Sequence, residues 1–185
     1  MSTRVSYNML SKLFHWTVLV LLIGQFALVW ASQLAFRSEF RDVGMGLLDL
    51  HKTFGLTLLA VVAARLLWRW VGGLPAWAGG VTDWEKITIR FLERWLYTLL
   101  IILPAIGVAY SVASGFPVHF FGYFTIPVLM NRDPVLANLA WIAHMLLGYA
   151  LVALIALHLG FVLRRRIFED PTYLRRMSFF NRRAS

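Results

Sequence analysis

The stretch LFHWTVLVLLIGQFALVWASQLAF, residues 13–36, has no charged side chain along its whole length. A helix of about 20 consecutive apolar residues is long enough to cross the hydrocarbon core of a bilayer. The stretch also exceeds the apolar run of a cleaved signal peptide, which is about 7 to 15 residues, so we expect it to be retained as a first membrane helix. It therefore predicts an integral membrane protein.

Three further stretches extend this pattern along the chain. The second includes Lys52, Arg65 and Arg69 near its ends, where long basic side chains can reach the membrane surface. The third is followed by an aromatic loop that contains Pro and Gly, which interrupt helices. We place these spans at residues 50–71, 94–114 and 135–163. The sequence predicts one transmembrane domain over residues 1–185, an all-α integral membrane four-helix bundle with a short basic C-terminal tail.

The composition agrees with a membrane protein. Hydrophobic residues make up 59% of the chain and charged residues 15%, against about 45–50% and about 25% in soluble domains. The chain has no Cys, which excludes disulfides, thiol nucleophiles, iron–sulfur clusters and the covalent attachment of c-type haem. Any metal or redox chemistry must use other ligands.

The net charge of +9 is explained by an excess of Lys and Arg on one side of the membrane. Of the 18 Lys and Arg residues, only Arg37, Arg41, Lys52 and Arg132 fall on the side of the membrane away from the termini. By the positive-inside rule, both termini are expected to be cytoplasmic. The charge therefore needs no nucleic-acid partner to explain it.

The histidines indicate the function. His15 and His158 fall toward the cytoplasmic ends of the first and fourth spans, whereas His51 and His144 fall toward the periplasmic ends of the second and fourth. His144 and His158 are fourteen residues apart, which puts them on nearly the same helix face and about 21 Å apart along the axis. The four form a cytoplasmic layer and a periplasmic layer.

Two neutral imidazoles on facing helices are what six-coordinate haem iron requires. The pattern predicts two haem b groups, one in each layer, with all four histidines as iron ligands. Gly55 and Gly148, each four residues after a histidine, leave room for a flat ring. The haem propionates need cations nearby. For that role we consider Arg65, Lys12 and Arg4 in the cytoplasmic layer and Lys52 in the periplasmic one.

Simpler interpretations exist for each of these residues. A single membrane histidine is usually structural, a membrane glycine usually serves helix packing, and Arg65 and Arg69 could be basic stop signals. A non-redox bundle with structural or proton-relaying histidines is thus an alternative, although no Asp or Glu lies inside the predicted spans. We interpret His119, in the loop after the third span, as a solvated residue, with a proton-transfer role as the alternative.

Each predicted span and the loop carry a recognisable motif: H-W in the first span, H-x-x-x-G with R-x-x-x-R in the second, L-P-x-x-G in the third, F-G before a Pro in the loop, and H-x-x-L-G-Y with a later His in the fourth. The residues are His15 and Trp16; His51, Gly55, Arg65 and Arg69; Leu103, Pro104 and Gly107; Phe121, Gly122 and Pro127; His144, Leu147, Gly148, Tyr149 and His158. In this combination of motifs the sequence resembles the bacterial cytochrome b561 family.

The resemblance implies a four-helix bundle in the bacterial inner membrane that carries electrons with two haem b groups and a quinone such as ubiquinone. One branch of the family is similar to a superoxide oxidase, a superoxide:ubiquinone oxidoreductase, which implies periplasmic superoxide as donor. The four far-side cations could then steer that anion. Another branch supplies membrane-anchor cytochrome b subunits, which implies instead a periplasmic redox protein, a dehydrogenase or hydrogenase, as partner.

Overall fold

The computed structural model describes residues 6–128, 130–171 and 173–179. Four long helices account for most of these residues, and each is long and apolar enough to cross a membrane. They are α1 (Met9–Phe36), α2 (Arg41–Gly72), α3 (Asp83–Ala113) and α4 (Pro134–Phe168). The predicted all-α membrane four-helix bundle is confirmed.

The helices run further than the predicted spans, because residues outside the apolar lengths continue them. α2 begins at Arg41 and α3 at Asp83, so both have a polar first part that continues the helix. The side chain of Thr82 accepts a hydrogen bond from the Glu85 backbone while the Glu85 carboxylate accepts one from the Thr82 backbone, which starts α3 with a capping box. Asp133 caps α4 in a similar way.

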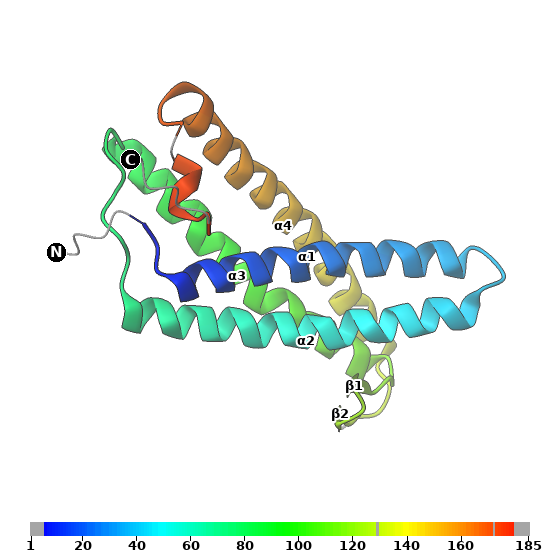
Figure 1. Cartoon of the computed structure of the whole chain (residues 1–185). Coiled ribbons are helices and arrows are strands. Elements are labelled where there is room, and N and C mark those ends of the chain that lie inside the picture. The colour runs from blue at the N-terminus through cyan, green and yellow to red at the C-terminus, as the bar shows by residue number, and fades with distance from the viewer. Residues whose placement is uncertain (1–5, 129, 172, 180–185) are drawn as a thin grey trace.

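The helices form two antiparallel pairs (Figure 1). α1 packs along α2, α3 packs along α4, and the pairs meet where α2 contacts α3. The described N-terminal and C-terminal residues lie together, with the Tyr7 backbone amide donating to the Arg176 carbonyl. We call this end of the bundle, with the α2–α3 connection, the basic end. The opposite end, which carries β1 and β2, is the hairpin end.

A small β-hairpin forms where the sequence indicated only a loop. β1 (Val118–Phe120) pairs antiparallel with β2 (Phe124–Ile126). Phe121 and Gly122 between them both have positive φ, and the Tyr123 amide donates to the Phe120 carbonyl. This is the geometry of a tight hairpin turn, which usually carries Asn-Gly or Asp-Gly. Phe is an unusual residue at positive φ, so this turn could not be predicted from its residues.

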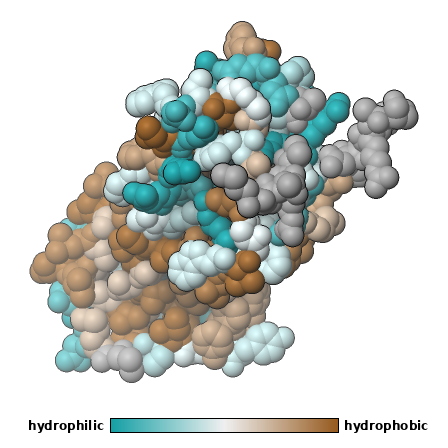
Figure 2. All heavy atoms as spheres, turned by 90° about the vertical axis from the view of Figure 1, so that its left-hand side faces the viewer, coloured by the Kyte–Doolittle hydropathy of each residue, from teal (hydrophilic) through white to brown (hydrophobic). Residues whose placement is uncertain are grey.

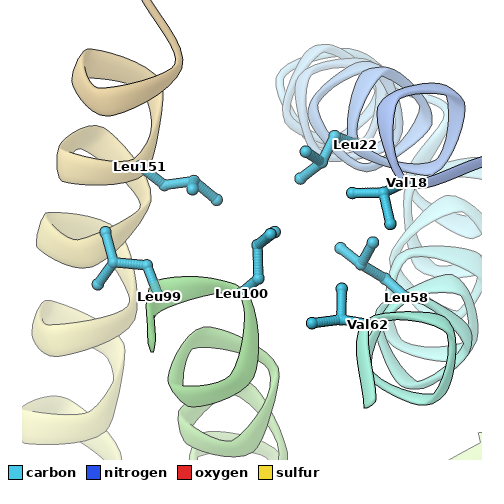
Figure 3. Packing of buried hydrophobic residues seen from close by; sticks show 7 residues of the cluster. All are labelled: Val18, Leu22, Leu58, Val62, Leu99, Leu100 and Leu151. Carbon is cyan, nitrogen blue, oxygen red and sulfur yellow. The ribbon is translucent and has the colours of Figure 1, made fainter. Parts of the chain in front are cut away.

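An apolar cluster occupies the middle of the bundle (Figure 3). Val18 and Leu22 lie between His15 and Gln25 along α1, and Leu151 lies between the two α4 histidines. All four helices contribute to it: Val18, Leu22, Leu58, Val62, Leu99, Leu100 and Leu151. The cluster therefore separates a polar layer near the basic end from another near the hairpin end.

Candidate haem-binding layers

His51 and His144 face each other across the bundle near the hairpin end. Their ring centroids are 6.2 Å apart and the ring planes are nearly perpendicular, at 83°. A metal bound between two imidazole nitrogens at about 2 Å from each, with roughly 1 Å more from each nitrogen to its ring centre, would separate the centroids by about 6 Å. The spacing of this pair, which we call the hairpin-end layer, permits both rings to bind one metal ion.

Both rings are fixed by backbone carbonyls from neighbouring helices. His51 Nδ1 donates to the Gln25 carbonyl on α1 at 3.3 Å, and His144 Nδ1 donates to the Leu103 carbonyl on α3 at 3.0 Å. A carbonyl only accepts, so in each neutral ring Nδ1 carries the proton and Nε2 keeps its lone pair. Histidines that bind metals are usually held by this kind of hydrogen bond from the other ring nitrogen.

The space beside these rings also suits a flat group. A methyl at Gly148 would meet nothing within 4 Å, and one at Gly55 would meet only the Gln25 side-chain oxygen, at 3.9 Å. Gly107 has a different role, because a Cβ there would lie 3.0 Å from the His144 ring. It lets α3 approach the ligand closely. The residues of the hairpin-end layer thus fit a haem.

His15 and Arg65 meet near the basic end. An Arg65 guanidinium nitrogen lies 3.3 Å from His15 Nδ1. His158 interacts electrostatically with both residues. Among the described residues, however, the rings of His15 and His158 are not in contact with each other. We call these three residues the basic-end layer. It contains two imidazoles and a cation, but its rings are not paired as those of His51 and His144 are.

The two arginines of the second span, Arg65 and Arg69, have partners on α3. Arg69 forms a two-pronged ion pair with Glu93, and one of the two contacts measures 2.7 Å. The guanidinium groups of Arg65 and Arg69 lie 5.4 Å and 5.9 Å from the centre of the Tyr97 ring, within the range of cation–π attraction. Glu93 lies just before the predicted third span, so sequence reasoning missed a carboxylate close to this layer.

The two lysines considered for propionates have partners within the protein. Lys12 is buried and donates to the Ser178 carbonyl at 2.8 Å, while Lys52 pairs with Asp49 at 3.0 Å. Arg4 lies outside the described residues. Arg65 is the candidate cation that the structure places against a predicted ligand.

His119 is exposed on β1, and its ring contacts the Thr125 hydroxyl across the hairpin at 2.9 Å. Its backbone carbonyl accepts a hydrogen bond of 2.8 Å from the hydroxyl of Thr53, which is buried two residues after His51. The β-hairpin is therefore fastened to α2 beside the hairpin-end layer. His119 belongs to neither layer, as expected.

The basic end is covered by a network that the sequence did not reveal. Arg165, predicted only as part of a basic stop, is 1% exposed and pairs with Glu85 at 2.8 Å and Glu169 at 3.1 Å. The 3₁₀ turn η1 (Tyr173–Arg176) lies close to α4, and the Trp16 indole donates to the Met177 carbonyl. Figure 2 shows hydrophilic side chains gathered over the upper part of this end.

Comparison with known proteins identifies the family. The family model described as prokaryotic cytochrome b561 matches residues 6–179. The chain is also 27% identical over 177 residues to cytochrome b561 homolog 2 of Escherichia coli (strain K12), an alignment that covers 95% of this chain and 93% of that protein. The paired histidines, the four membrane helices and this match lead to one conclusion: the chain belongs to the prokaryotic cytochrome b561 family and is a multi-pass membrane cytochrome that binds b-type haem in electron transfer.

Proposed function

We propose that the chain holds two haem b groups, one with His51 and His144 and one with His15 and His158, and passes electrons between a donor and the quinone pool. The observation that carries the proposal is the hairpin-end layer, where two opposed rings both have Nδ1 bonded to carbonyls. Haem iron supplies one-electron redox chemistry at each site. A match to the cytochrome family also argues against the non-redox bundle.

Different residues of the protein support the two layers. The carbonyls of Gln25 and Leu103 orient the hairpin-end ligands, and Arg65 supplies positive charge for a propionate in the basic-end layer. The central apolar cluster keeps water out of the region between the layers. Gly55 and Gly148 would leave space for the rings, while Lys12 and Lys52 would reach a propionate only by giving up their present partners.

We place the basic end in the cytoplasm and the protein in the bacterial inner membrane, because Lys and Arg concentrate at that end. The hairpin end then faces the periplasm. There Arg37, Arg41 and Arg132 are exposed and could attract a small anion. Arg132 also lines an open groove of about 290 Å³ between α3 and α4, which contains Tyr110 and Trp141.

Superoxide is the donor that we favour, with ubiquinone as acceptor. In the balanced reaction, two superoxide anions are each oxidised to O₂, and one quinone takes up the two electrons and two protons to become a quinol. The proposed activity is thus that of a superoxide:ubiquinone oxidoreductase.

A membrane-anchor subunit for a periplasmic dehydrogenase or hydrogenase is the second candidate. The β-hairpin favours it, because its turn presents aromatic side chains to the outside: Tyr123 is 87% exposed, and Phe121 and Phe124 are about half exposed. Exposed aromatic residues are common at protein interfaces. In this case a redox protein would dock on the hairpin end.

The first test is the haem content of the detergent-purified protein, from a reduced-minus-oxidised spectrum and a pyridine haemochrome assay. We expect two haem b per chain, one after His144→Leu, and two in the control His119→Ala. One haem or none in the unmodified protein would contradict the two-layer proposal. Quinone reduction by the purified protein on exposure to superoxide would support the oxidase, whereas activity only with a partner enzyme would support the anchor subunit.

A further inference from the structure

Gln25 is a buried polar residue in the most apolar part of α1. It is 8% exposed and sits beyond the central cluster, level with the hairpin-end layer. Its side-chain amide donates to the His51 carbonyl at 3.1 Å. We propose that Gln25 is a positioning residue that clamps α1 to α2 at His51 and thereby sets the plane of the His51 ring. The inference rests on the proposed role of His51 as a haem ligand.

The clamp consists of two hydrogen bonds that run in opposite directions between the same two residues. The Gln25 amide donates to the His51 backbone, and the His51 ring donates to the Gln25 backbone at 3.3 Å. A slide of α1 along α2, or a rotation of either helix, would stretch both bonds at once. The side chain of Gln25 therefore holds its own carbonyl in place beneath the ring.

The Gln25 side chain packs against a glycine on the facing turn of α2. A Cβ at Gly55 would come within 3.9 Å of the Gln25 side-chain oxygen, so the amide lies over this glycine. Inside a membrane the alternative to this bond is an amide with no partner, which is costly. The arrangement is thus a specific one rather than a loosely placed polar group.

The orientation of the rings has a spectroscopic consequence. His144 is held from α3 through Leu103, while His51 is held from α1 through Gln25, and the two planes end up 83° apart. If both rings held a haem, their nearly perpendicular planes would give its low-spin ferric form a strongly anisotropic EPR signal with one large g value, whereas more parallel rings would give a rhombic signal. A ring hydrogen bond also makes the ligand more basic, which favours the ferric state.

The test compares Gln25→Met with Gln33→Met. Methionine keeps the length of glutamine but cannot donate, and Gln33 is exposed on the same helix, so the control makes an identical chemical change away from the layer. We expect Gln25→Met to change the anisotropic EPR signal toward a rhombic one, to raise one midpoint potential, and to speed haem transfer to apomyoglobin about tenfold, the low end for residues that support metal ligands. Gln33→Met should leave all three unchanged.

If Gln25→Met does not accumulate, Gln25→Asn serves instead, because it keeps a buried amide that is one methylene too short to reach the His51 carbonyl. A Gln25 variant that matches Gln33→Met in EPR signal, potential and haem transfer would overturn the clamp while leaving the two-haem proposal intact. A wild-type protein with no bis-histidine signal from the hairpin-end layer would overturn both. The two failures are therefore distinguishable.

Discussion

Replacing Gly107 by Ala should displace a proposed haem ligand without unfolding the bundle. An added Cβ would lie 3.0 Å from Cε1 and 3.3 Å from Nδ1 of His144. Carbon atoms in contact prefer about 3.5–4.0 Å, so the ring must retreat by about 0.5 Å. The Nδ1 bond to the Leu103 carbonyl is 3.0 Å long, and that retreat takes it past the usual upper limit of about 3.2 Å.

The expected effect on stability is small. Overpacking costs about 1–3 kcal/mol, and the gain from replacing a helical Gly by Ala offsets about 0.5–1 kcal/mol of it. The effect on the site should be larger, because losing the hydrogen bond that supports a metal-bound histidine typically costs about 10–100-fold in affinity. The variant should therefore fold with a slightly lower Tm and lose haem from one layer.

Gly24→Ala is the matched control, because a Cβ at Gly24 meets nothing within 4 Å. Haem per chain, the rate of haem transfer to apomyoglobin and the Tm should be measured for both variants in the same detergent. Gly24→Ala should behave as the unmodified protein. If Gly107→Ala also keeps two haems with an unchanged transfer rate, the close approach of α3 does not position His144 and the reasoning is refuted.

Three further perturbations test other parts of the structure. Arg165→Met should lower the free energy of unfolding by about 1.5–3 kcal/mol, because it removes the nearest charged partner of Glu85 and leaves that carboxylate with Thr82 and the more distant Arg164, whereas the more exposed Arg164→Met should cost about 1 kcal/mol or less; denaturation of the two variants checks this. Burial raises the pKa of Tyr173 above its ordinary value of 10.0. The phenol therefore ionises at a lower pH in the unfolded protein than in the folded one, so the free energy of unfolding should fall as the pH rises through 10.0 and above. Tyr173→Phe should lessen that fall in thermal melts. Arg65→Met should lower the midpoint potential of one haem in a redox titration, because a nearby cation favours the reduced form.

The sequence was sufficient to predict the membrane helices, and it put His51 and His144 at one level of the bundle, where the structure brings their rings into contact. Charge-free stretches of sufficient length predict spans directly, and the position of a histidine within a span fixes its depth. His51 and His144 could therefore be assigned to one layer before their 6.2 Å separation was known. The polar ends of α2 and α3 were missed, because hydropathy reports the lipid-crossing length and not where the helix begins.

The supports around the ligands could not be predicted in the same way. The partner of His144 is the backbone carbonyl of Leu103, which has no signature in the sequence. Gln25 did leave a signal, an amide in the middle of an apolar run, but its partner follows only from the packing of α1 on α2. In the sequence Arg165 is one of three consecutive arginines after an apolar span, and only the packing of α3 against α4 shows that Glu85 lies against it.

The two layers differ in the groups that contact their histidines. In the hairpin-end layer each ring donates a hydrogen bond from Nδ1 to a neutral carbonyl. This bond makes Nε2 a more basic ligand for iron and so stabilises the oxidised state of the metal. In the basic-end layer the full positive charge of Arg65 lies 3.3 Å from His15, which stabilises the reduced state instead. With one haem in each layer, as proposed, the hairpin end would have the lower potential. Electrons would then pass from the hairpin end toward the basic end, the direction required for a donor that arrives at the exposed cations of the hairpin end.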